Sequence, residues 1–148
     1  MLIADSDAIV SDADSAQLQT IEIEITDLLD VGDELLFADT TGTSIAASYN
    51  PATGVLTLSG ADTVANYQQV LRTVRYDNAA GAPDTTSRVI TFVASDGLRF
   101  SNVATTTVTI EITPTGMAIW RNELSTTPEF NLWNGASFGT AADTDSVG

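Results

Sequence analysis

The chain has 148 residues, 43% of them hydrophobic, and its twenty Asp and Glu against five Arg give a formal net charge of −15. This acidity argues against binding to nucleic acids and to anionic membrane surfaces, because both carry negative charge. It favours divalent cations, since carboxylate oxygens are the ligands that Ca²⁺ prefers. The alternative reading is that the acidic residues serve only to keep the protein soluble.

The same composition limits the class of protein. The length and the hydrophobic fraction fit one folded domain with a core, or one such domain plus a fragment of another. Without Cys there is neither a disulfide framework nor a thiolate metal site. No apolar run reaches the length of a membrane span, so we expect no membrane insertion. Residues 1–5 lack the basic and apolar regions of a signal peptide.

The first half of the chain contains the clearest strand pattern. Residues 3–10 are predicted as a short strand or an edge segment, interrupted by polar residues, and residues 11–16 as an acidic loop. At 17–26 the apolar Ile21, Ile23 and Ile25 alternate with Glu22 and Glu24. This period of two predicts a strand with one buried and one exposed face. A turn at 27–33 and a short strand at 34–38 follow.

A hairpin and a helical segment are predicted next. Residues 44–49 and 55–59 form the hairpin, because Pro51 presets the turn between them and Gly54 suits a positive-φ position. Across 62–76 the apolar residues recur at intervals of three and four, which predicts one or two helical turns. Asp62 or Thr63 is expected to cap their start.

Two further strands complete the predicted sandwich. Residues 88–95 are apolar on both faces, which favours an interior strand, and Asp96-Gly97 predicts a turn after it. Residues 102–112 form a long strand, with Val108, Ile110 and Ile112 facing inward. About seven short strands with turns at this spacing predict an all-β fold, a β-sandwich with one short helical segment.

The chain changes character after 112. Residues 113–116 are expected to be a linker, and 117–148 the truncated start of a second β unit, so that the sandwich spans 1–112. Within the second unit, Asn134-Gly135 predicts a hairpin between 130–133 and 136–138.

Catalysis is not expected from this composition. The chain has no His, Lys or Cys, which removes the commonest general base and the commonest covalent nucleophiles apart from Ser, and Ser needs a base. A pair of carboxylates that hydrolyses glycosides is the least favoured function.

The most specific chemical signal is the pair Asp12 and Asp14. In an extended or turn segment, residues two apart can aim both carboxylates to one side, and their mutual repulsion is offset when a cation binds. The alternative is a solvated loop in which Asp12 caps a turn. From their positions alone, Asp96 is a residue of a hairpin turn and Asp62 is a helix cap.

Four motifs in a fixed order carry a family likeness. They are VSDADS at 10–15, YNPATGVLTLSG at 49–60, YQQVLRTVRY at 67–76 and FVASDG at 92–97. Together they resemble the cadherin-like repeats of large bacterial surface proteins, close to the chondroitin-sulfate-proteoglycan type of repeat. The resemblance implies a Greek-key β-sandwich of cadherin or immunoglobulin type, arranged in tandem with others, over roughly 3–112.

The resemblance also implies calcium at the junctions between repeats. Asp12, Asp14 and Asp96 match the family's ligands at the N-terminal end of a repeat, and Asp62 matches an acidic position that faces the following repeat. The acidic linker of the family is replaced here by residues 113–116, which carry no carboxylate. The implied site is therefore half of a junction site.

The sequence thus predicts a calcium-rigidified structural or adhesive repeat, located at the cell surface or outside the cell. The expected partners are neighbouring repeats of the same chain and a cell-surface protein or glycan. The alternative function is a carbohydrate-binding module of a secreted enzyme, which an exposed coplanar row of aromatic side chains would favour.

Overall fold

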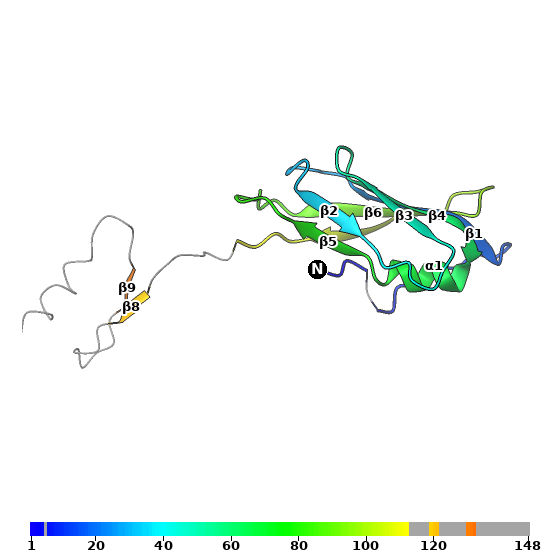
Figure 1. Ribbon diagram of the computed structural model, residues 1–148, viewed down its shortest axis with the longest axis horizontal. Helices are drawn as coiled ribbons and strands as arrows, with labels where there is room; N and C mark the ends of the chain where they lie inside the picture. Colours follow the sequence, from blue (N-terminus) through cyan, green and yellow to red (C-terminus); the bar gives the residue numbers. More distant parts are fainter. Residues whose placement is uncertain (5, 113–118, 122–129, 133–148) are drawn as a thin grey trace, which may run out of the picture. The chain divides into compact units, whose positions relative to one another are not determined.

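The computed structural model describes residues 1–4, 6–112, 119–121 and 130–132. The chain divides into two compact units, Met1–Glu111 and Ile112–Gly148. Figure 1 labels the elements of both.

The first unit is an all-β sandwich with one short helix, as the sequence predicts. A five-stranded antiparallel sheet has the order β3-β4-β1-β6-β7, and a two-stranded sheet, β2-β5, packs against it (Figure 1). The elements are β1 (Gln17–Ile25), β2 (Glu34–Phe37), β3 (Ala46–Asn50), β4 (Val55–Thr63), α1 (Val64–Leu71), β5 (Arg75–Asn78), β6 (Arg88–Ser95) and β7 (Ala104–Val108).

Strand β1 is the centre of the larger sheet, and its alternating pattern predicts its burial correctly. Ile21, Ile23 and Ile25 are at most 2% exposed, whereas Glu22 and Glu24 face solvent. Its neighbours β4 and β6 come from later in the chain and pair with it on opposite sides. Removing the apolar face of β1 from water is the main contribution of this strand to stability.

The predicted hairpin is confirmed as β3–β4. The carbonyl oxygen of Asn50 accepts hydrogen bonds from the amides of Thr53 and Gly54, at 3.2 and 2.9 Å. Gly54 has φ +72°, the left-handed conformation that glycine adopts without strain. A second glycine on β4, Gly60, has φ +129°, and a Cβ atom there would lie 2.6 Å from the carbonyl oxygen of Ser44.

The predicted helical segment is α1, which begins after Thr63. The Thr63 hydroxyl accepts a hydrogen bond from the amide of Asn66 at 3.1 Å, so Thr63 is the N-cap. The helix buries Tyr67, Val70 and Leu71. The Tyr67 hydroxyl lies 2.7 Å from the carbonyl oxygens of Gln19 and Gly60, which ties the helix to β1 and β4, and burial raises its pKa to about 12.

Two segments at the ends of the unit pair over a shorter stretch than the sequence predicts. The N-terminal stretch is an edge segment, one of the two forms predicted for 3–10: Leu2 makes one bridge to Arg75, Ile3 donates to the Val74 carbonyl oxygen, and a turn follows at residues 6 and 7. Strand β7 stops at Val108 instead of continuing to 112, because its partner β6 begins at Arg88, the residue opposite Val108. Ile112, predicted to face inward, is 57% exposed.

A buried ion pair closes the end of the sandwich at which β6 begins. The Arg88 guanidinium is fully buried, and it donates to the Glu34 carboxylate through Nε and to Asp30 Oδ2 through Nη2, the latter at 2.8 Å. Glu34 Oε2 accepts the amides of Leu29 and Asp30 at 3.0 and 2.9 Å, and Oε1 accepts the Tyr76 hydroxyl at 2.6 Å. One carboxylate thus holds β2, β5, β6 and the turn before β2 together.

The second unit contains a short antiparallel pair, β8 (Ile119–Arg121) with β9 (Phe130–Leu132), in the register Trp120 to Asn131. The hairpin predicted across Asn134-Gly135 lies outside the described residues.

Candidate metal centre

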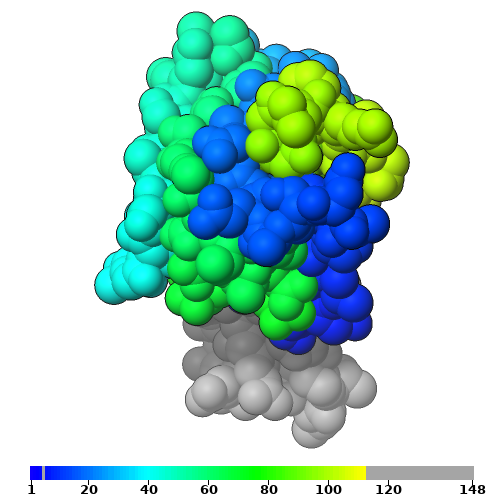
Figure 2. All heavy atoms as spheres, turned by 90° about the vertical axis from the view of Figure 1, so that its right-hand side faces the viewer, coloured from blue at the N-terminus to red at the C-terminus, as the bar shows by residue number. Residues whose placement is uncertain are grey.

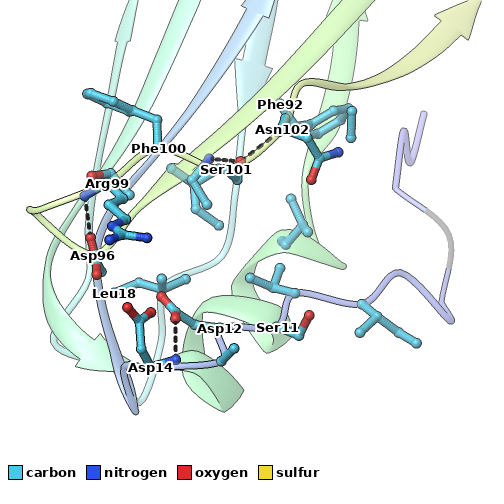
Figure 3. Close-up of a pocket in the computed structure, with 18 residues that line it drawn as sticks. Ser11, Asp12, Asp14, Leu18, Phe92, Asp96, Arg99, Phe100, Ser101 and Asn102 are labelled. Atoms are coloured by element: carbon cyan, nitrogen blue, oxygen red, sulfur yellow. Dashed lines mark hydrogen bonds between the residues drawn. The ribbon is translucent and has the colours of Figure 1, made fainter.

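Three carboxylates from distant parts of the chain meet at one end of the sandwich. Asp12 and Asp14 precede β1, and Asp96 follows β6. Thr20 pairs with Ser95, so the start of β1 and the end of β6 lie at the same end of the sheet. One oxygen atom from each carboxylate lies within 4.8 Å of the other two, and Figure 3 shows the three side chains gathered together. We call these three residues the acidic cluster.

Backbone hydrogen bonds hold two of the three carboxylates in place. Asp12 Oδ1 accepts from the amides of Asp14 and Ser15, both at 3.1 Å. Asp96 Oδ1 accepts from the amides of Leu98 and Arg99 at 2.8 and 2.7 Å. These short-range bonds are typical of Asp in turns, and they set the direction of each carboxylate without a ligand.

Within the acidic cluster, two carboxylates have lowered pKa values and the third has a raised one. The amide of Asp14 lowers the pKa of Asp12, and the amide of Arg99 lowers that of Asp96, so both carboxylates are held ionised. Hydrogen bonding to the Asp12 side chain and repulsion from its charge raise the pKa of Asp14. Asp14 is therefore the member of the cluster whose ionised form is disfavoured by the neighbouring carboxylates.

The structure does not bring Asp62 to this cluster. Its carboxylate is nearly buried and accepts three hydrogen bonds, each of 2.7 Å, from the amides of Ser44 and Thr63 and from the Asn66 side chain. The bond from the Ser44 amide is the main cause of its lowered pKa. Asp62 thus connects the start of α1 to the chain before β3.

A cavity of about 360 Å³ opens beside the acidic cluster. One wall is the segment 9–14 and the other is the chain from 99 to 104. Figure 2 shows the blue N-terminal segment next to the yellow-green 96–103 loop at this end of the molecule. Its floor is apolar and includes Leu18, Ile21 and Phe92, and the exposed Ile9 and Phe100 stand on its two walls.

Sequence reasoning missed this cavity and its exposed apolar walls. The signal was present in the turn after β6, where Leu98 and Phe100 follow Asp96-Gly97 although a solvent-exposed turn has no need of large apolar side chains.

Comparison of the chain with protein-family models, with curated proteins and with solved structures finds no match. In the part of the chain that the structure describes, no helix is long and apolar enough to cross a membrane.

Proposed function

We propose that this protein is a structural β-sandwich module that binds Ca²⁺ through Asp12, Asp14 and Asp96. The observation that carries the proposal is the convergence of the three carboxylates within 4.8 Å of one another. Ca²⁺ takes six to eight oxygen ligands, and three carboxylates supply at most about six. A bound cation also removes the repulsion that raises the pKa of Asp14.

In this proposal the module is a tandem repeat of a large extracellular bacterial protein with a structural or adhesive role. The acidic cluster lies at one end of the sandwich and Asp14 is exposed, so oxygen atoms of a neighbouring repeat have access to the same ion. An ion that binds only the correctly placed pair of repeats stabilises that arrangement by linkage.

The alternative, a carbohydrate-binding module, gains no support from the three tyrosines of the sandwich. Sugar binding by stacking needs exposed aromatic rings. Tyr67 and Tyr76 are 0% and 4% exposed, and the Tyr49 hydroxyl donates to the Glu34 carbonyl oxygen at 2.8 Å, so these three tyrosines belong to the folded core.

The test is a calcium titration of the protein and of Asp14→Asn. We expect Ca²⁺ to raise the melting temperature of the parent protein, because a ligand that binds only the folded state stabilises it. Asp14→Asn is the sharpest variant because the Asp14 side chain, unlike that of Asp12, accepts no backbone hydrogen bond among the described contacts. It should abolish the calcium response and leave the metal-free melting temperature equal or higher.

Glu22→Gln is the matched control, because it removes one exposed charge from the outer face of β1 and leaves the cluster intact. It should respond to Ca²⁺ as the parent does. Calorimetry that detects no heat of binding, together with an unchanged melting temperature at millimolar Ca²⁺, would sink the proposal. A response that persists in Asp14→Asn would place the ion elsewhere.

Acid should weaken calcium binding, with Asp14 titrating first. Its pKa is raised in the metal-free protein, so protons compete with Ca²⁺ at a higher pH for Asp14 than for Asp12 or Asp96, whose pKa values are lowered. The affinity should therefore fall as the pH drops from about 7 toward about 4, near the ordinary range for Asp. Calorimetry at several pH values measures this, and an affinity that is constant over the range would contradict it.

In EDTA the same shifts act on stability in opposite directions. The pKa of Asp14 is higher in the folded state than in the unfolded state, so protonation of Asp14 favours folding. The contribution of Asp14 to the free energy of unfolding therefore becomes more favourable as the pH falls. The lowered pKa values of Asp12, Asp62 and Asp96 mean that their contributions are present above the unfolded pKa and are lost as the pH falls through the folded one. Asp14→Asn should therefore lose stability more steeply than the parent in acid.

A further inference from the structure

Strand β7 is the edge of the five-stranded sheet, with β6 as its neighbour on one side in the strand order. Residues Ala104 to Val108 pair with Phe92 to Arg88 on one side of β7. On its other side, no strand of the described first unit pairs with β7. The exposed backbone of an edge strand is a template for a further strand.

Two cavities lie along this strand, one at each end of it. The first, of about 360 Å³, reaches Ala104 and the acidic cluster. The second, of about 380 Å³, is lined by residues 106–108 of β7 and by Met1, Leu2 and Ile3. The N-terminal segment forms a wall of both, so the two cavities mark a seam between that segment and β7.

Exposed apolar side chains are frequent in the two segments that contribute to these cavities, although only Met1, Leu2, Ile9 and Phe100 line them. Half of the large apolar residues that are exposed in the described part of the chain belong to the N-terminal segment or to the 98–103 loop. They are Met1, Leu2, Ile9, Leu98, Phe100 and Val103, with exposed fractions from 53% to 91%. A concentration of this kind is typical of an interaction surface.

The net negative charge at one end of the seam favours a partner that carries a positive charge there. Asp12, Asp14 and Asp96 stand at the Ala104 end with Arg99 as the only positive residue of that cavity. A partner that lies along β7 therefore meets the apolar side chains of Met1, Leu2 and Ile3 together with the hydroxyls of Thr106 and Thr107 at one end, and a net negative charge at the other.

We propose that an extended peptide segment of a partner protein docks along β7 as an added antiparallel strand. Its inward side chains are apolar and cover the two cavities, and a Lys or Arg near its C-terminal end contacts the acidic cluster. An antiparallel partner runs from Val108 to Ala104, which puts its C-terminal end at the cluster. Ala104 and Val108 are four residues apart, about 13 Å in a strand, so the covering side chains are at positions i and i+4.

The probe is a fluorescein-labelled peptide, Thr-Val-Thr-Val-Thr-Val-Thr-Arg, measured by anisotropy against the full chain in EDTA. EDTA keeps this test separate from the calcium proposal, because the docking surface needs no metal. We expect saturable binding by about 1 mM peptide. Two changed peptides should bind at least about tenfold more weakly: one with Glu in place of Arg, and one with proline at its fourth position, which cannot complete the ladder.

Protein variants locate the site. Phe100→Ser and Ile9→Ser should each weaken binding about tenfold, because each removes an apolar wall. Both side chains are more than three-quarters exposed, so both variants should fold. Val31→Ser is the matched control: Val31 is 63% exposed and lines neither cavity. It should bind as the parent does.

Amide chemical-shift mapping decides where the peptide lies. The largest changes should fall on residues 1–14 and 99–108. No binding at 1 mM, equal binding of the three peptides, or shifts centred on β3 or on the outer face of the larger sheet would each overturn the proposal.

Discussion

Replacing Arg88 by methionine should destabilise the protein by about 3–5 kcal/mol, the usual cost of removing one partner from a buried ion pair. Glu34 is 1% exposed, and its carboxylate would lose the guanidinium that compensates its charge. A typical domain has only about 5–15 kcal/mol of stability in total. Chemical denaturation followed by circular dichroism measures the loss.

Two further variants separate charge from packing. Arg88→Lys should fall between the parent and Arg88→Met, because an ammonium keeps the charge but cannot contact Glu34 and Asp30 with the geometry of a guanidinium. Adding Glu34→Gln to Arg88→Met should recover part of the lost stability, since no uncompensated charge is then buried. If Arg88→Met costs less than about 1 kcal/mol, the pair is not an important part of the folded state.

Gly60→Ala should cost about 2–4 kcal/mol, although it adds a single methyl group. At φ +129° an L-residue is strained, and the new Cβ atom would lie 2.6 Å from the Ser44 carbonyl oxygen. That oxygen belongs to backbone, so either β4 or the chain before β3 has to move. The measurement is again the free energy of unfolding.

Gly81→Ala is the control, because a Cβ atom there meets nothing within 4 Å and its φ is not in the left-handed region. It should remain within about 1 kcal/mol of the parent, or stabilise slightly by restricting the unfolded chain. Equal losses in the two alanine variants would refute the steric account of Gly60.

The order of residues along the chain predicted individual strands and turns better than it predicted which strands pair. The alternation around Ile23 and the turn around Gly54 each depend on neighbours in sequence, and both appear as predicted. The early end of β7 depends on where its partner β6 begins, which the alternation within 102–112 does not record. Nothing within the 11–16 loop shows that Asp96 lies beside it, because the pairing of β1 with β6 decides that.

Part of the buried ion pair could have been predicted from the alternation of inward and outward residues along the strand 88–95. Ile90, Phe92 and Ala94 are the inward face of the strand 88–95, and Arg88 has the same parity. An Arg on the core side of a strand requires a buried carboxylate. Sequence alone does not say which of the twenty acidic residues supplies it.

The position of β1 at the centre of the larger sheet has a consequence for how the chain reaches its folded state. Both partners of β1 are made dozens of residues later, so the strand stays unpaired until β4 and then β6 are available. Such long-range pairing slows folding and exposes a strand-forming segment to other chains. Glu22 and Glu24 place charge between the isoleucines of that segment and so oppose its aggregation before β4 and β6 pair with it.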